Sequence, residues 1–71
     1  MPISRLFRLL YILLERERVP APELAQTLEV SVRTIYRDVQ TLGEAGIPVY
    51  AERGRDGGVA ILPTFRLNKS M

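Results

Sequence analysis

The fold can be read from residues 30–46, whose sequence is VSVRTIYRDVQTLGEAG. Apolar residues recur there three or four positions apart, which predicts an amphipathic helix from Val32 to about Ala45. The side chains expected on its buried face are Val32, Ile35, Val39 and Leu42. Ser31 is the expected N-cap, because its hydroxyl can accept a hydrogen bond from a backbone N–H one turn into the helix. Gly46 is the expected terminating glycine.

The opposite face of this helix is polar, and Arg33 and Arg37 lie one turn apart on it. The major groove of B-DNA is about 12 Å wide and admits one α-helix, and the arginine fork matches O6 and N7 of guanine. We therefore expect a recognition helix over residues 32–45, in which Arg33, Thr34 and Arg37 read base edges. The residues of this region expected to contact phosphates are Ser31, Tyr36 and Gln40.

These assignments also have structural alternatives. Arg33 and Arg37 could be solvated charges that pair with acids of the same helix. Thr34 could be plain helix surface, and Tyr36 lies beside the buried face and could pack against the core. Asp38 is expected to orient an arginine rather than to face DNA, because phosphates repel a carboxylate.

Two helices are expected before the recognition helix. The nearer one runs from Pro22 to Leu28, since Pro20 stops the preceding segment and a proline suits the first helical position. Its expected buried side chains are Leu24, Ala25 and Leu28. Residues 29–31 then form a tight turn into the recognition helix.

The first helix is expected over about residues 4–18. Its expected buried face consists of Ile3, Leu6, Phe7, Leu10, Leu13 and Leu14, and its polar face carries Arg5, Arg8 and Arg16. Leu9 lies at the edge of the buried face, and Ile12 lies among the arginines. They are either single exposed apolar residues, which are common, or part of a contact with a second protomer or another domain.

A β-hairpin is expected after the helices. Residues 49–53 and 59–62 have strand character, and the three glycines of residues 54–58 suit the turn between them. Arg53 and Arg55 lie at this turn and are expected to lie along the DNA backbone or enter the minor groove. The alternative is an ordinary solvated turn.

Three helices followed by a two-stranded wing at residues 49–62 predict a winged helix-turn-helix, a mainly α fold with a small β-hairpin. Residues 1–63 are expected to form this domain, and residues 64–71 a tail or the start of a linker. A chain of 71 residues is long enough for one such domain with a thin core.

The composition argues against catalysis. The chain has no cysteine and no histidine, which removes thiolate metal sites and the commonest general base at neutral pH. We therefore expect no catalytic residue, no metal and no cofactor. The apolar run of residues 9–14 is too short to span a membrane, so a cytoplasmic protein is expected. The net charge of +2 is only a weak nucleic-acid signal.

The sequence resembles the N-terminal domain of DeoR-like bacterial transcription regulators, and more closely the branch with a C-terminal WYL effector-sensing domain. The resemblance covers almost all of residues 3–66. It rests on Leu24-Ala25, residues 30–39, residues 45–49, Gly54 and Gly57-Gly58. The specific part is the run from Ser31 to Asp38. Glu29 departs from the pattern, since related motifs commonly have glycine in this turn.

The resemblance implies a repressor or activator that binds a palindromic or pseudo-palindromic operator as a homodimer. It assigns the recognition role to Ser31, Arg33, Thr34, Tyr36 and Arg37. It also implies an effector ligand that binds a C-terminal domain beyond Met71.

A second function class stays open, namely a winged-helix module that binds another protein and no DNA. Residues 31–58 carry four arginines against four acidic residues, which leaves them near neutral. A positive face over the recognition helix and the hairpin would favour DNA, whereas a mixed face with an exposed apolar patch would favour a protein.

Overall fold

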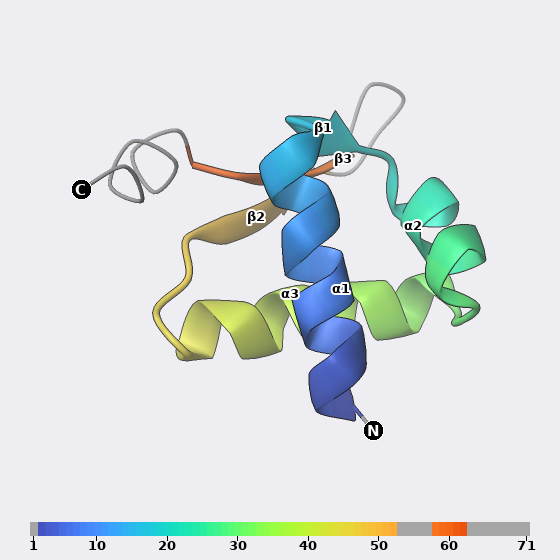
Figure 1. Cartoon of the computed structure of the whole chain (residues 1–71), viewed down its shortest axis with the longest axis horizontal. Coiled ribbons are helices and arrows are strands. Elements are labelled where there is room, and N and C mark those ends of the chain that lie inside the picture. The colour runs from blue at the N-terminus through green and yellow to red at the C-terminus, as the bar shows by residue number, and fades with distance from the viewer. Residues whose placement is uncertain (1, 53–57, 63–71) are drawn as a thin grey trace.

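A computed structural model describes residues 2–52 and 58–62, apart from the side chains of Pro2 and Ile3. Its elements are α1 (Pro2–Glu15), β1 (Arg18–Val19), α2 (Ala21–Leu28), α3 (Val32–Glu44), β2 (Val49–Glu52) and β3 (Gly58–Ile61). In Figure 1, α1 stands upright in front of α3, which runs across behind it, and the strands lie above α3. Three helices with a small antiparallel sheet confirm the predicted winged helix-turn-helix fold. None of the described helices is long and apolar enough to cross a membrane.

The sheet has one strand more than predicted. β2 and β3 form the expected hairpin, and β1 adds to the other side of β3, with Val19 opposite Val59. The prediction that the first helix continues to Arg18 is therefore wrong, since α1 ends at Glu15. Pro20 disfavours helical backbone at Val19, and the extended segment pairs with β3 instead.

Gly58 has a different role from the one predicted. It was expected in the turn, but it is the first residue of β3. A Cβ atom on it would lie 2.8 Å from Cγ of Arg18 and 3.2 Å from the carbonyl oxygen of Val19. The glycine is therefore required for the close approach of β1.

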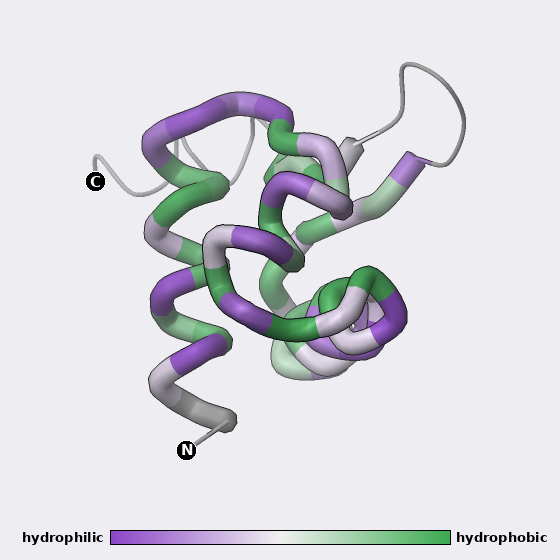
Figure 2. The backbone as a smooth tube through the Cα atoms, turned by 90° about the vertical axis from the view of Figure 1, so that its right-hand side faces the viewer, coloured by the Kyte–Doolittle hydropathy of each residue, from purple (hydrophilic) through white to green (hydrophobic). Residues whose placement is uncertain are grey.

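The core lies between the three helices and the sheet. Its largest fully buried side chains are Leu9, Leu13, Val19, Leu24, Ile35 and Val59, which come from every element except β2. The residues predicted to be buried on α2 are buried. Figure 2 shows hydrophobic and hydrophilic positions alternating along α1, as expected of a helix with one face on the core.

The buried face of α1 differs from the prediction. Leu9 and Leu13 are fully buried, whereas Phe7, expected inside, is 66% exposed. Leucines occur on both sides of this helix, so periodicity alone did not fix its rotation. In the structure Arg5, expected in solvent, turns inward to Asp38 of α3 and brings Leu9 into the core with it.

The termini of α3 follow the sequence closely. Ser31 is the N-cap as predicted, since its Oγ accepts a hydrogen bond from the backbone N–H of Thr34 at 3.1 Å. Gly46 has a φ of +93°, which fits the predicted helix-terminating glycine. Before the helix, Glu29 takes the left-handed conformation, with φ 60° and ψ 45°, which glycine adopts more readily than other residues.

The buried face of α3 is partly as expected. Ile35, Val39 and Leu42 are buried, but Val32 is exposed. Val32 lies in the first turn, where it lines an open groove instead of the core. Asp38 occupies a buried position beside Val39.

Candidate nucleic-acid interface

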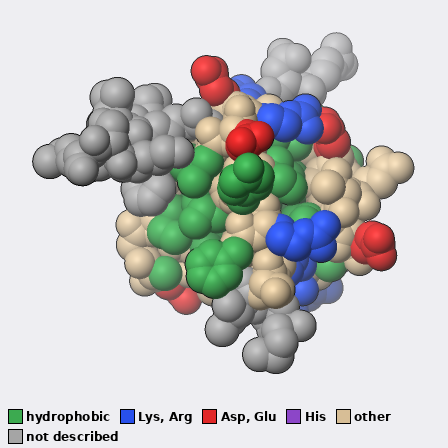
Figure 3. All heavy atoms as spheres, viewed as in Figure 1, with side chains coloured by type: hydrophobic (Ala, Val, Ile, Leu, Met, Phe, Trp, Pro, Cys, Tyr) green, Lys and Arg blue, Asp and Glu red, His purple; other side chains and the backbone are tan. Residues whose placement is uncertain are grey.

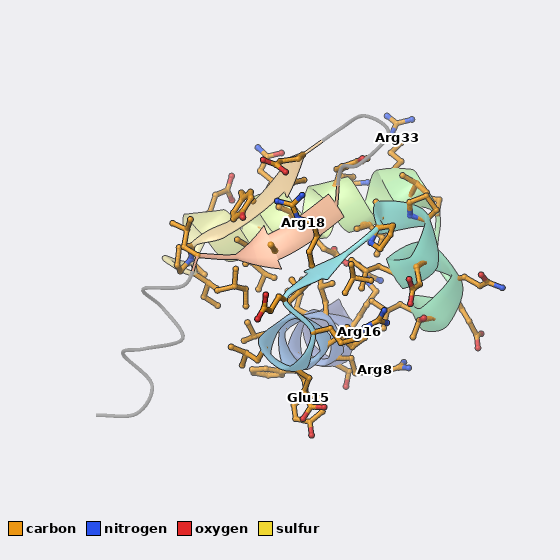
Figure 4. All side chains as sticks on the ribbon, turned by 90° about the horizontal axis from the view of Figure 1, so that it is seen from above. Arg8, Glu15, Arg16, Arg18 and Arg33 are labelled. Atoms are coloured by element: carbon orange, nitrogen blue, oxygen red, sulfur yellow. The ribbon has the colours of Figure 1, made fainter. Side chains whose placement is uncertain are left out.

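The outer face of α3 brings together most of the predicted contact residues. Arg33, Arg37 and Gln40 are exposed and recur at helical spacing on one side. Thr34 and Tyr36 are half-buried at the two edges of this side. Figure 4 shows Arg33 projecting outward from α3, away from α1. The helix therefore presents one stripe to the core and an opposite stripe to solvent, as a recognition helix requires.

An open groove runs along this face. It has a volume of about 690 Å³ and is lined by Val32, Arg33, Tyr36, Arg37, Val39, Gln40 and Ala51. Ala51 belongs to β2, so the groove joins the recognition face of α3 to the first strand of the wing. Neither Val32 nor Ala51 was predicted as an interface residue, because Val32 was expected on the buried face of the helix and Ala51 only as part of a strand.

The described arginines divide into two groups. The ion pairs are Arg5–Asp38 at 2.6 Å, Arg16–Glu23 at 2.6 Å and Arg18–Glu52 at 2.8 Å. Within the described part of the chain, Arg8, Arg33 and Arg37 form no ion pair. The alternative in which acids of α3 neutralise Arg33 and Arg37 is therefore not realised among these residues. No acid of the described residues therefore occupies their guanidinium donors, which are the groups that bind phosphates and bases.

Asp38 is held away from this face by Arg5. Arg5 donates two hydrogen bonds to its carboxylate, from Nε to Oδ2 at 2.6 Å and from Nη2 to Oδ1 at 3.0 Å. These hydrogen bonds, more than the opposite charge itself, raise the pKa of Arg5 above its ordinary value, and desolvation opposes them. Asp38 thus orients an arginine, as expected, but one from α1. A carboxylate at a position of the buried face was the signal in the sequence that a basic partner lies across the core.

The first turn of α3 carries two coupled hydroxyl groups. Besides capping the helix, Ser31 Oγ lies 3.1 Å from Thr34 Oγ1, close enough for a hydrogen bond in either direction. The backbone N–H groups of this turn lie at the positive end of the helix dipole. Ser31, at this end, is placed where a phosphate oxygen would be stabilised. Thr34 is consequently tied to the cap and is less free than Arg33 to reach a base.

Tyr36 packs against the core, as one of the two interpretations of the sequence expected, and its phosphate contact stays a prediction. It also lines the groove. The wing residues Arg53 and Arg55 lie outside the described residues, so their predicted contacts stay predictions.

Comparison with known proteins gives a family. A family model described as an HTH domain matches residues 5–59. An uncharacterised HTH-type transcriptional regulator of Bacillus subtilis strain 168, YobV, is 45% identical over 69 residues, which cover 97% of this chain and 22% of that protein. The chain thus spans about a fifth of the length of this curated relative. No solved structure is a significant match.

Proposed function

Because this chain belongs to the helix-turn-helix (HTH) domain family, we propose that it is the sequence-specific DNA-binding domain of a bacterial transcriptional regulator. α3 enters the major groove, and the wing at residues 49–62 lies on the backbone or in the minor groove. The observation that carries the proposal is that Arg33 and Arg37 point outward and form no ion pair with a described acid. By contrast, Arg5, Arg16 and Arg18 are each paired with a carboxylate. The relative that is an HTH-type transcriptional regulator supports the regulatory role.

Sequence reading is assigned to the exposed stripe of α3. Arg33 and Arg37 are one turn apart, so their guanidinium groups reach neighbouring base pairs, each of which would be a guanine. A bidentate arginine–guanine contact discriminates against a wrong base by about 1–3 kcal/mol. Thr34 is placed at the edge of the stripe, where its methyl group can contact a thymine methyl.

Backbone contacts are assigned around this stripe. Ser31 sits at the positive end of α3, and Gln40 lies one turn beyond Tyr36 on the groove side. These three are proposed to contact phosphates of one strand. Arg53 and Arg55 are proposed to contact the backbone or minor groove from the wing. Such contacts position the protein without reading sequence.

The proposed assembly extends beyond this domain. The resemblance to DeoR-like regulators of the WYL branch supports residues 1–63 as the DNA-binding domain and residues 64–71 as a tail or linker start. It also supports a homodimeric regulator on a palindromic operator, with an effector ligand bound by a C-terminal domain. DNA binding in a bacterium would place the protein in the cytoplasm.

A module that binds only proteins is the weaker candidate. The exposed apolar patch that would favour it is present, but it lies on α1 and not on α3. In Figure 4 the labelled Arg33 of α3 and Glu15 of α1 lie on opposite sides of the molecule. The cationic stripe is therefore separate from the apolar one, and protein binding at α1 does not compete with DNA binding at α3.

The test is selection of duplexes from a random pool, followed by affinity measurement on the enriched sequence and on random duplex. Wild type is expected to prefer the enriched sequence, and Arg37→Ala to lose most of that preference, by about tenfold or more. Arg16→Ala is the matched control, because Arg16 is already paired with Glu23 and should keep the preference. Failure to enrich any sequence, or equal discrimination by Arg37→Ala and wild type, would reject the proposal.

A further inference from the structure

The helix α1 has an apolar face that no described residue covers. Phe7 and Tyr11, one turn apart, are 66% and 64% exposed. They belong to a shallow hollow of about 570 Å³ lined by Phe7, Arg8, Leu10, Tyr11, Ile12 and Leu14. Figure 3 shows hydrophobic side chains gathered on the side of the molecule where α1 lies in Figure 1. An apolar patch with a charged rim is typical of a protein contact.

Two opposite charges flank this face on the same edge. Arg8 and Glu15 are seven residues apart, which places them two turns apart on one side of the helix. Neither forms an ion pair with another residue of the described chain. Figure 4 shows Glu15 projecting from α1 away from the sheet and Arg8 projecting to one side of the helix. The edge is thus positive toward the start of the helix and negative toward its end.

This arrangement is complementary to itself. When two identical helices pair antiparallel, a two-fold axis relates the two copies. Each residue then lies opposite the partner's residue that is equally far along the helix on the other side of the axis. The midpoint between Arg8 and Glu15 falls between residues 11 and 12, beside Tyr11. An axis there sets Arg8 against the partner's Glu15 and Glu15 against the partner's Arg8, with Tyr11 between the two charge contacts and Phe7 one position outside them. We infer that α1 binds the α1 of a second copy of this chain in antiparallel orientation.

This contact differs from the dimer proposed for a palindromic operator. Arg33 and Glu15 lie on opposite sides of the molecule (Figure 4). Pairing through α1 therefore turns the two α3 helices away from each other, and the pair can hold two separate duplexes. The inference does not depend on DNA binding, since its residues are all on α1.

The first test is disulfide cross-linking of the proposed dimer through an introduced cysteine. One face of a helix of 14 residues is smaller than the roughly 800 Å² per partner of a standard interface, so the association is expected to be weak. The chain contains no cysteine, so a single introduced thiol reports on self-contact. Tyr11→Cys lies next to the proposed axis and should form disulfide dimers about tenfold faster than Gln26→Cys, an exposed position on α2.

The second test exchanges the charges. Two proteins are made in the Tyr11→Cys background, one with Arg8→Glu and one with Glu15→Arg. Each alone places like charges opposite each other at both contacts and should cross-link more slowly, by about tenfold. Mixed together they recreate two opposite-charge contacts, so the mixed dimer, identified by its mass, should form at the rate of the parent.

The two tests decide the inference. A faster reaction at position 11 with recovery in the mixture supports pairing through α1. Equal rates at positions 11 and 26, or a mixture no faster than its components, would overturn it and leave the face to another partner. All altered residues are exposed, so circular dichroism should show native helix content throughout. DNA affinity is measured separately, because these variants leave α3 intact.

Discussion

Arg5 and Asp38 join α1 to the buried side of α3 through two parallel hydrogen bonds, of 2.6 Å and 3.0 Å. The pair has two consequences. It sets the rotation of α1 on the core, which buries Leu9 and leaves Phe7 outside. It also holds the carboxylate of Asp38 on the inner side of α3, so that the recognition stripe beside Arg37 keeps its positive charge.

Removing Arg5 is expected to destabilise the domain. In Arg5→Met the carboxylate of Asp38 stays buried without its two donors, which is costly. We expect thermal unfolding to show a Tm lowered by at least about 5 °C. The double variant Arg5→Met with Asp38→Leu replaces the pair by apolar groups and should recover most of the loss. A double variant no more stable than Arg5→Met would contradict this account.

The same pair makes a prediction about pH. Because the pKa of Arg5 is raised in the folded protein, its contribution is fully present at neutral pH and is lost only as the pH rises into the strongly alkaline range. The difference in Tm between wild type and Arg5→Met should therefore stay constant from about pH 6 to about pH 9. A difference that shrinks within this range would indicate that another group titrates.

Ser31 is expected to have two separable roles. Ser31→Ala removes the N-cap and should lower the free energy of unfolding by about 1 kcal/mol, measured by chemical denaturation. Ser31→Asp keeps a capping oxygen and should be nearly as stable as wild type. The added charge faces phosphate, so Ser31→Asp should bind all duplexes more weakly. Unchanged affinity of Ser31→Asp would remove this residue from the phosphate contacts.

Two glycines near the end of α3 should respond oppositely to the same substitution. Gly43 is exposed within the helix, and an added Cβ atom meets nothing within 4 Å, so Gly43→Ala should stabilise by about 0.5 kcal/mol. Gly46 also has free space, but its φ of +93° strains any L residue. Gly46→Ala should therefore destabilise by about 1 kcal/mol. If chemical denaturation shows that both substitutions change the free energy of unfolding in the same direction, the turn must rearrange and the account of Gly46 is wrong.

The wing is expected to contribute to DNA affinity through its positive charge and not to sequence discrimination. Arg55→Ala should weaken binding to operator and random duplex by the same factor. The slope of log affinity against log salt concentration should become shallower by about 0.9 for one lost phosphate contact. A selective loss on the operator would instead assign Arg55 to base reading in the minor groove.

The recognition segment could be predicted from the sequence almost to the residue. Its signals are local: Ser31 caps the helix by contacting its own next turn, Gly46 ends it through its own backbone freedom, and Arg33 and Arg37 share a side by spacing alone. The wing hairpin was likewise marked by its glycines. Each of these features depends on neighbours in the chain, which periodicity and turn chemistry describe well.

The features that the sequence did not reveal depend on contacts between distant residues. The strand at Arg18 and Val19 is too short to show a pattern and exists through pairing with β3. The rotation of α1 was ambiguous because Phe7 and Leu9 are both apolar. It is settled by the link from Arg5 to a residue 33 positions away, which no local pattern encodes.

The central claim is that an arginine of the exposed stripe of α3 reads a guanine in the major groove. The direct measurement replaces each guanine of the selected operator in turn by 7-deazaguanine, which removes N7 and leaves base pairing unchanged. Affinities of wild type and Arg37→Ala are then compared on each duplex. At one guanine, wild type should lose about tenfold in affinity while Arg37→Ala loses nothing, because its contact is already gone. Losses of the same size in both proteins at every guanine would contradict the claim.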